Sequence, residues 1–199
     1  MYVLVCVLVA GFVWTSIQVK RSELEGNTLF GSSQNTIKVS SDAPLTGHKA
    51  PDFALKSLKG SQVSLADFKG KVVLLDFFST WCPPCRAAVP VLQDLEAKYK
   101  DKGLEVISID EQESQSLVRD YAKEMRYTAL MLLDEDGSAG DKYKVNGLPT
   151  FVIIDQKGKV AAYQTGFAPY AMDDIEGRIC KLLGIQFTPR YGRSHNERH

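Results

Sequence analysis

One stretch constrains the fold of this chain more than any other: residues 72–90, which read VVLLDFFSTWCPPCRAAVP. It opens with a continuous apolar run, which is typical of a strand covered on both faces of a sheet. Two cysteines follow, separated by two prolines. Pro83 suits the first position of a helix, where its missing N–H needs no partner, and helix-forming residues continue to Tyr99. The stretch predicts a buried strand, a short turn and a helix that starts beside Cys82.

Cysteines at such a turn are chemically active. The unpaired N–H groups and the positive end of the helix dipole stabilise a thiolate at a helix N-terminus. In Cys-x-x-Cys motifs the thiol pKa therefore falls from about 8.5 to roughly 7 or lower. Cys82 is the candidate attacking thiol. Cys85 lies one turn later on the same helix face, where we expect it to be shielded and able to resolve a mixed disulfide.

The cysteine pair has two chemical interpretations, a redox pair or half of a metal site. Four cysteines in 199 residues are too few for a structural disulfide framework. A zinc site would need two further ligands, but Cys180 and His48 are far apart in the sequence and the other two histidines are close to the C-terminus. The redox interpretation is favoured, with no metal and no cofactor other than the Cys82–Cys85 disulfide.

Composition restricts the function classes. Lys plus Arg and Asp plus Glu both number 24, so the formal net charge is zero. No basic patch is evident, and nucleic acid is not expected as a partner. An apolar content of 44% in 199 residues suits one globular domain with extensions.

The order of the predicted elements indicates an α/β fold. Strands alternate with helices in the first part, and the last two strands form a hairpin, so we expect a central mixed β-sheet flanked by helices. Residues 53–55 and 62–65 flank a Lys-Gly turn and predict an N-terminal β-hairpin extension. The other predicted elements are strands at 104–109, 129–133, 150–155 and 159–164 and helices at 114–125, 138–143 and 171–183.

Residues 1–19 form an apolar segment at the N-terminus. As a helix, residues 2–19 span about 27 Å, just enough for a bilayer core, and we predict a membrane anchor at residues 1–19. A cleaved signal peptide is the main alternative, although no small-residue cleavage site follows the apolar run; a buried soluble helix is the third. Lys20 and Arg21 come after the segment, and the positive-inside rule alone would place the domain in the cytoplasm.

Two further segments are expected to lie outside the folded domain. Residues 20–46 are rich in Ser, Gly, Asn and Thr and predict a linker. Residues 186–199 are polar and basic and predict a disordered tail. The domain itself is predicted to cover residues 47–185.

Three features together resemble the thioredoxin superfamily: WCPPC after an apolar strand, an acidic residue within that strand, and GLPT at residues 147–150. The opening GHKAPDFAL at residues 47–55 is similar to that of the membrane-anchored TlpA/ResA-like branch, whose domain is related to the redoxin AhpC-TSA type. The resemblance covers residues 47–185. It implies a thioredoxin-like fold and a thiol-disulfide oxidoreductase whose domain is extracytoplasmic, or periplasmic or secreted if the N-terminal segment is cleaved.

The resemblance also assigns roles to single residues. Asp76 matches the buried aspartate of thioredoxins and would accept the proton of Cys85; the alternative is an edge position whose side chain reaches water. Glu113 matches a glutamate near the cysteines of ResA-like proteins and could tune proton transfer. A solvated acidic loop, or a favourable acid at a helix N-terminus, explains Glu113 equally well, and Glu111 is a rival for the role.

The remaining candidates would bind substrate. Pro149 matches the cis-proline that faces the cysteines in this superfamily, and its loop would present the Leu148 backbone to an extended peptide. The alternative is a trans proline that opens a strand. Trp81 is expected to shield Cys82 and, with Pro83, to contact substrate, unless it is a plain core aromatic.

These expectations combine into a function. We expect reduction of disulfides in extracytoplasmic proteins, with electrons supplied by a transmembrane donor of the CcdA/DsbD type and cytochrome c maturation as a family-implied context. A thiol peroxidase of the peroxiredoxin type is an alternative: the APDF opening and Ser79 fit it, but Leu75 stands where peroxiredoxins carry proline. A non-catalytic protein-binding module that uses the groove at residues 148–149 is another.

Overall fold

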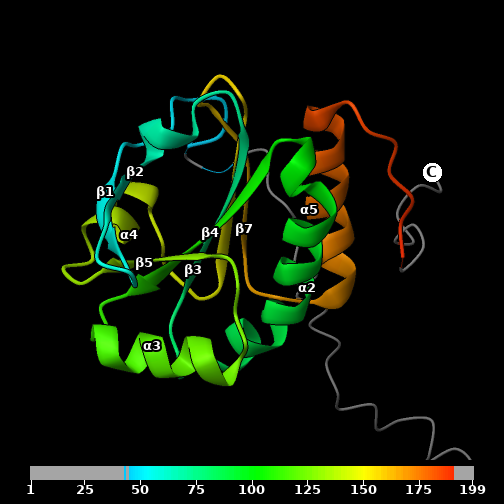
Figure 1. Cartoon of the computed structure of the whole chain (residues 1–199). Helices are drawn as coiled ribbons and strands as arrows, with labels where there is room; N and C mark the ends of the chain where they lie inside the picture. Colours follow the sequence, from blue (N-terminus) through cyan, green and yellow to red (C-terminus); the bar gives the residue numbers. More distant parts are fainter. Residues whose placement is uncertain (1–42, 44, 191–199) are drawn as a thin grey trace, which may run out of the picture. The chain divides into compact units, whose positions relative to one another are not determined.

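The computed structural model describes residues 43 and 45–190, and these form a seven-stranded sheet with helices on both faces (Figure 1). The strands are β1 Ala54–Ser57, β2 Gln62–Ser64, β3 Val72–Phe78, β4 Leu104–Glu111, β5 Leu130–Asp134, β6 Thr150–Ile154 and β7 Val160–Thr165. The α-helices are α2 Pro83–Tyr99, α3 Gln115–Glu124, α4 Ser138–Tyr143 and α5 Pro169–Leu183. Two short 3₁₀ helices are η1 Leu65–Phe68 and η2 Lys100–Lys102.

The sheet is mixed, as the element order predicts. Its strand order is β2-β1-β5-β4-β3-β6-β7. Strand β4 lies between β3 and β5 and is parallel to both, whereas β6 is antiparallel to β3 and to β7. Strands β1 and β2 form the N-terminal hairpin and join the sheet through β5. The predicted fold class is confirmed.

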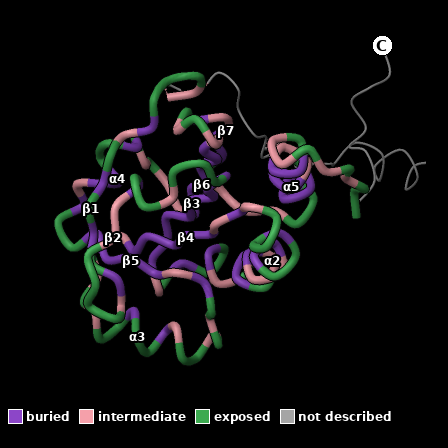
Figure 2. The backbone as a smooth tube through the Cα atoms, turned by 45° about the horizontal axis from the view of Figure 1, so that its top comes forward, coloured by how far each residue is buried: buried purple, intermediate pink, exposed green. Residues whose placement is uncertain are grey.

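The alternating side chains of β3 divide the core into two layers. Val73, Leu75 and Phe77 pack on the face that α4 covers. Leu74 and Phe78 pack on the opposite face, against α2 and its neighbours α3 and α5. Every residue of β3 is buried, and Figure 2 shows the central strands as the buried part of the domain. The turn after β3 therefore starts from a buried strand with neighbours on both sides.

The described ends of the chain differ from the predicted boundaries. Ala43 and Leu45 pack against the core cluster on the α4 face of the sheet, although the sequence assigns them to a linker. Phe187 packs against the helical face, and Arg190 forms ion pairs with Asp94 and Glu176. These two residues belong to the predicted tail but are held by an apolar surface and by two carboxylates. Phe187 and Arg190 thus make defined contacts with the domain, while the disordered tail at residues 186–199 stays a prediction.

The predicted anchor at residues 1–19 and most of the linker lie outside the described residues, as do residues 191–199 of the tail. Among the residues that the structure describes, no helix combines the length and the apolar character needed to cross a membrane.

Candidate active site

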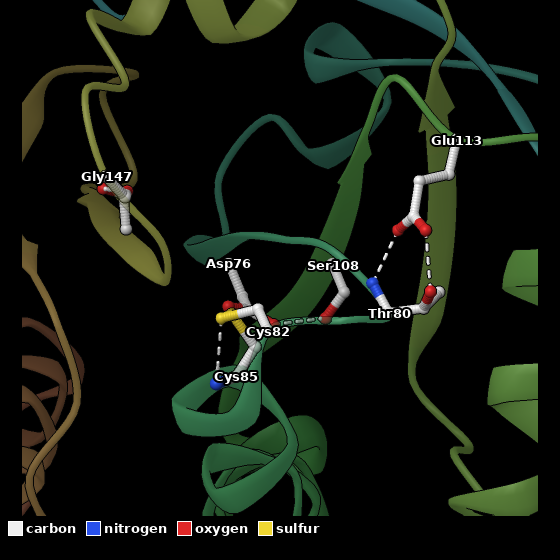
Figure 3. Close-up of a disulfide and its surroundings, with 8 residues drawn as sticks. Asp76, Thr80, Cys82, Cys85, Ser108, Glu113 and Gly147 are labelled. Carbon is white, nitrogen blue, oxygen red and sulfur yellow. Dashed lines mark hydrogen bonds between the residues drawn. A yellow bond between two sulfur atoms is a disulfide. The ribbon is translucent and has the colours of Figure 1, made fainter.

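The two cysteines lie at the junction between β3 and α2, and they are joined by a disulfide (Figure 3). Cys82 is the N-cap of α2 and has an extended backbone, while Pro83 and Pro84 open the helix. The backbone N–H of Cys85 donates a hydrogen bond to Cys82 Sγ over 3.3 Å. The first turn of the helix thus directs an N–H at the Cys82 sulfur, which is the arrangement that stabilises a thiolate once the disulfide is reduced.

Burial does not distinguish the two cysteines. Cys82 is 3% exposed and Cys85 is 2% exposed, so the expected difference in shielding is absent from this disulfide form. The difference lies in the backbone instead, because Cys82 precedes the helix and Cys85 is inside it. Trp81 is 72% exposed, which excludes a core position for its ring, while its shielding of Cys82 stays a prediction. Leu148 packs against the cluster that contains both cysteines.

Asp76 lies on the α2 face of β3, between Leu74 and Phe78. Strand β3 lies between β4 and β6, so the alternative of an edge position is excluded. Asp76 is 4% exposed, and burial raises the pKa of its carboxyl group to about 7. Figure 3 shows the carboxyl group directed at the cysteine pair. A carboxyl group with that pKa can exchange protons with a thiol near neutral pH.

The neighbours of Asp76 include two residues that sequence reasoning missed. Ser108 of β4 is paired in register with Asp76, and its hydroxyl donates to Asp76 Oδ2 over 2.9 Å. Ser108 Oγ also lies 2.6 Å from the hydroxyl of Tyr127. A signal for Ser108 existed in the sequence, since it is a polar residue between Ile107 and Ile109 in a buried strand. Nothing in the sequence pattern indicated Tyr127.

The loop before β6 carries a cis peptide bond between Leu148 and Pro149, as predicted. The hydroxyl of Thr150 donates to the Gly147 carbonyl over 2.7 Å, and the Gly166 N–H donates to the Pro149 carbonyl over 2.7 Å. Both bonds fix the loop to the start of β6 and the end of β7. The contact of Leu148 with the cysteine cluster brings this loop to the disulfide, while contact with substrate stays a prediction.

Glu113 does not touch the sulfurs in this form but holds the loop that leads to them. Its carboxylate accepts the backbone N–H of Thr80 over 2.5 Å and the Thr80 hydroxyl over 2.7 Å (Figure 3). The Glu113 N–H donates in turn to Asp110, whose pKa is raised to about 8 by burial and by Glu113. The rival Glu111 points to the other face of the sheet, where burial, Asp134 and Asp141 raise its pKa to about 7.

The remaining observations concern the thiol peroxidase and metal-site alternatives and the fourth cysteine position, Cys180. Leu75 is fully buried in β3 on the α4 face. Within residues 43 and 45–190 no group of three or more His, Cys, Asp or Glu side chains could hold a metal ion. Cys180 is a free, fully buried thiol in the apolar core between α5 and the sheet, and it behaves as a small core residue.

Comparison with known proteins agrees with this geometry. The profile of the AhpC/TSA family matches residues 46–163, which is more than half of the chain. A thiol-disulfide oxidoreductase named ResA from Bacillus thuringiensis is 40% identical over 114 residues; the match covers 57% of this chain and 66% of that protein, just under two thirds of its length.

Two solved structures share the fold. One is a candidate thiol:disulfide interchange protein DsbE from Chlorobium tepidum, with a TM-score of 0.66 and 36% identity over 68% of this chain and 96% of that one. The other is a secreted Mycobacterium tuberculosis disulfide oxidoreductase homologous to E. coli DsbE, with a TM-score of 0.59 and 25% identity over 65% of this chain and 96% of that one. The chain therefore belongs to the AhpC/TSA family, as a thioredoxin-fold relative of the ResA and DsbE thiol-disulfide oxidoreductases.

Proposed function

We propose that this protein is a membrane-anchored thiol-disulfide oxidoreductase that reduces disulfides of proteins outside the cytoplasm. The observation that carries the proposal is the Cys82–Cys85 disulfide at the N-terminus of α2, with the buried carboxyl group of Asp76 directed at it. The disulfide form described here is the oxidised product of the reaction, and the dithiol is the form that acts on a substrate.

The first step is attack by Cys82. Its thiolate, stabilised by the helix N-terminus, forms a bond to one sulfur of the target disulfide. The bond between the two target sulfurs breaks, and the second target sulfur leaves as a thiolate that takes up a proton. Enzyme and target are then joined through Cys82.

The second step releases the target. The thiol of Cys85 passes its proton to the carboxylate of Asp76 and forms a bond to Cys82 Sγ. The bond between Cys82 and the target breaks, and the target leaves as its second thiolate. The target has gained two electrons, and the enzyme is in the disulfide form seen here.

Substrate contacts are assigned to the surface around the turn. Trp81 and Pro83 are exposed beside the buried sulfurs, and the Leu148–Pro149 loop contacts the same cluster. An extended peptide lying along this loop would place its disulfide at Cys82, with main-chain pairing as in strand addition. Exposed apolar groups next to the reacting atom suit protein substrates of varied sequence.

The proposal also includes where the reaction takes place and what supplies the electrons. The apolar segment at residues 1–19 supports an anchor, and the related Mycobacterium tuberculosis protein is secreted. An anchored reductant must be recharged from the cytoplasm, which a transmembrane donor of the CcdA/DsbD type would do. Apocytochrome c cysteines are the substrate class that the family resemblance implies.

The test is reduction of a disulfide-bonded protein. The full chain in detergent, with dithiothreitol as electron source, should accelerate insulin reduction well above the rate with dithiothreitol alone, and Cys82→Ser should abolish the acceleration. Full activity in Cys82→Ser would instead favour a binding module. Consumption of hydrogen peroxide faster than of insulin disulfides would favour the thiol peroxidase alternative.

A further inference from the structure

Three polar side chains form a hydrogen-bonded chain inside the apolar layer between the sheet and its helical face. Ser108 Oγ donates to Asp76 Oδ2 over 2.9 Å and lies 2.6 Å from the Tyr127 hydroxyl. Ser108 is 1% exposed, and Tyr127 packs against both apolar clusters on this face. Polar groups in such surroundings are costly unless they are hydrogen-bonded. The hydrogen bonds among Tyr127, Ser108 and Asp76 therefore give each of these buried groups a partner.

The direction of each bond follows from the number of protons. A serine hydroxyl has one proton to donate, and that proton is directed at Asp76. An ionised Asp76 can only accept, so in that state the short contact with Tyr127 is a bond in which the tyrosine O–H donates to Ser108 Oγ. The bonds run from Tyr127 through Ser108 to Asp76 and end on Oδ2. The other carboxyl oxygen, Oδ1, is buried without a hydrogen-bond partner among the described residues.

We propose that Ser108 and Tyr127 are positioning residues for release of the target: they hold Asp76 with Oδ2 bound to β4 and leave Oδ1 as the acceptor of the Cys85 proton. This inference rests on the proposed function. In the step concerned, the proton moves from Cys85 Sγ to Asp76 Oδ1 as the sulfur electron pair forms the bond to Cys82. The bond from Cys82 to the target breaks, and the target sulfur takes that electron pair.

The groups that face Asp76 determine how its ionisation responds. The two cysteines face it from the start of α2, and Phe151 is its register partner on β6. Tyr121 of α3 and Tyr127 are close enough to feel its charge. Burial first, and then the charge of Asp76, raise the pKa of both tyrosines above the usual range, so both stay neutral near pH 7. The Ser108 hydrogen bond lowers the pKa of Asp76 against the effect of burial.

The experiment uses the reduced protein and the aromatic disulfide dithiobis(nitrobenzoic acid), which liberates one coloured thiolate at each step. The fast phase reports attack by Cys82 and the slow phase reports release by Cys85; Cys85→Ser should lose the slow phase only. In wild type the release rate should rise with pH to a plateau. Ser108→Ala should move the midpoint of that rise upward by about one pH unit, because one hydrogen bond to the carboxylate is lost.

Tyr127→Phe should move the midpoint in the same direction but less, because it removes only the donor to Ser108. Ser108→Thr, which keeps the hydroxyl, should restore the wild-type midpoint. Tyr143→Phe is the matched control: it removes a buried tyrosine hydroxyl that donates to Pro51 on the other face of the sheet, and should shift nothing. The difference between the midpoint of each variant and that of wild type is the readout.

The outcomes separate the inference from the function on which it rests. If wild type never liberates the second thiolate, the proposed exchange fails. If wild type shows both phases but Ser108→Ala and Tyr127→Phe keep its midpoint, the positioning role is overturned and the exchange stands. Should Ser108→Ala not fold, Tyr127→Phe compared with Tyr143→Phe decides the question. In an Asp76→Asn background, loss of the Ser108 hydroxyl should change the profile no further.

Discussion

Asp76 combines a buried carboxyl group, which is unfavourable for folding, with the proposed role of proton acceptor. Its carboxyl group lies in the middle of a sheet, is 4% exposed and has a pKa raised to about 7 from 3.8 by burial. In the unfolded chain the same group ionises near pH 4. The folded state therefore holds a proton between about pH 4 and pH 7 that the unfolded chain has already lost, and stability falls as the pH rises through that interval.

Asp76→Asn should remove this dependence. A shift of about three pKa units corresponds to about 4 kcal/mol, so the variant should gain stability over wild type progressively from pH 4 to 7, by on the order of 4 kcal/mol above pH 7. Denaturant unfolding of both proteins in the disulfide form at a series of pH values measures the difference. An equal difference at pH 5 and pH 8 would contradict the raised pKa.

Glu113 is a second residue whose role the contacts define. Glu113→Gln replaces one of the two acceptors that hold Thr80, and it should cost about 1–3 kcal/mol of stability and slow the attack by Cys82. The pH midpoint of the release step should not move. Glu135→Gln, an exposed acid in a turn, is the control. A moved midpoint at unchanged stability would show instead that Glu113 takes part in proton transfer.

At the scale of the secondary-structure elements, α2 makes the two cysteines unequal. Both are buried in the disulfide, but only Cys82 lies at the N-cap and receives an N–H from the first turn. The proposed exchange requires one ionised and one protonated thiol. The helix N-terminus provides this difference through its N–H groups and its dipole.

Alkylation of the reduced protein tests that difference. Iodoacetamide at mildly acidic pH should modify Cys82 at least tenfold faster than Cys85, because the rate follows the thiolate fraction. Peptide mapping after quenching at several times gives both rates. The buried Cys180 should react only after unfolding and serves as an internal control. Equal rates at Cys82 and Cys85 would contradict the assigned roles.

Arg190, the last described residue, is held by two helices. Arg190 lies between Asp94 of α2 and the buried Glu176 of α5, at 2.6 and 2.8 Å. Arg190→Ala should lower the free energy of unfolding by about 1 kcal/mol, since the guanidinium is partly exposed while Glu176 loses a partner. Lys123→Ala, which removes an exposed ion pair with Asp120, should cost less. An equal cost for the two variants would mean that the Arg190 contact contributes no more than an exposed surface ion pair.

For the molecule as a whole, the sequence predicted what depends on local pattern. Each predicted strand and helix after residue 53 is present, because hydrophobic runs and turn residues specify these elements with little help from distant contacts. The cis bond at Pro149 followed from the family motif. Helix α5 starts at Pro169, earlier than predicted, since proline at the first position suits a helix start.

Other features depend on register and on long-range packing. The partnership of Asp76 with Ser108 requires the β3–β4 register, and Tyr127 reaches them only because its loop packs over both clusters. Glu113 meets Thr80 across more than thirty positions of the chain. The ordered contacts of Phe187 and Arg190 were hidden by a polar, basic composition. The periodic pattern of apolar residues along the sequence predicts none of these contacts.

The most direct test of the central claim is to trap the intermediate of the exchange. Cys85→Ser, reduced and then mixed with a protein that contains a disulfide, cannot complete the second step and should accumulate a covalent adduct through Cys82. Intact-mass measurement followed by peptide mapping identifies both the adduct and its site, and dithiothreitol should reverse it. Cys82→Ser under the same conditions should form little adduct. Absence of an adduct in Cys85→Ser, or equal adducts in both variants, would contradict attack by Cys82.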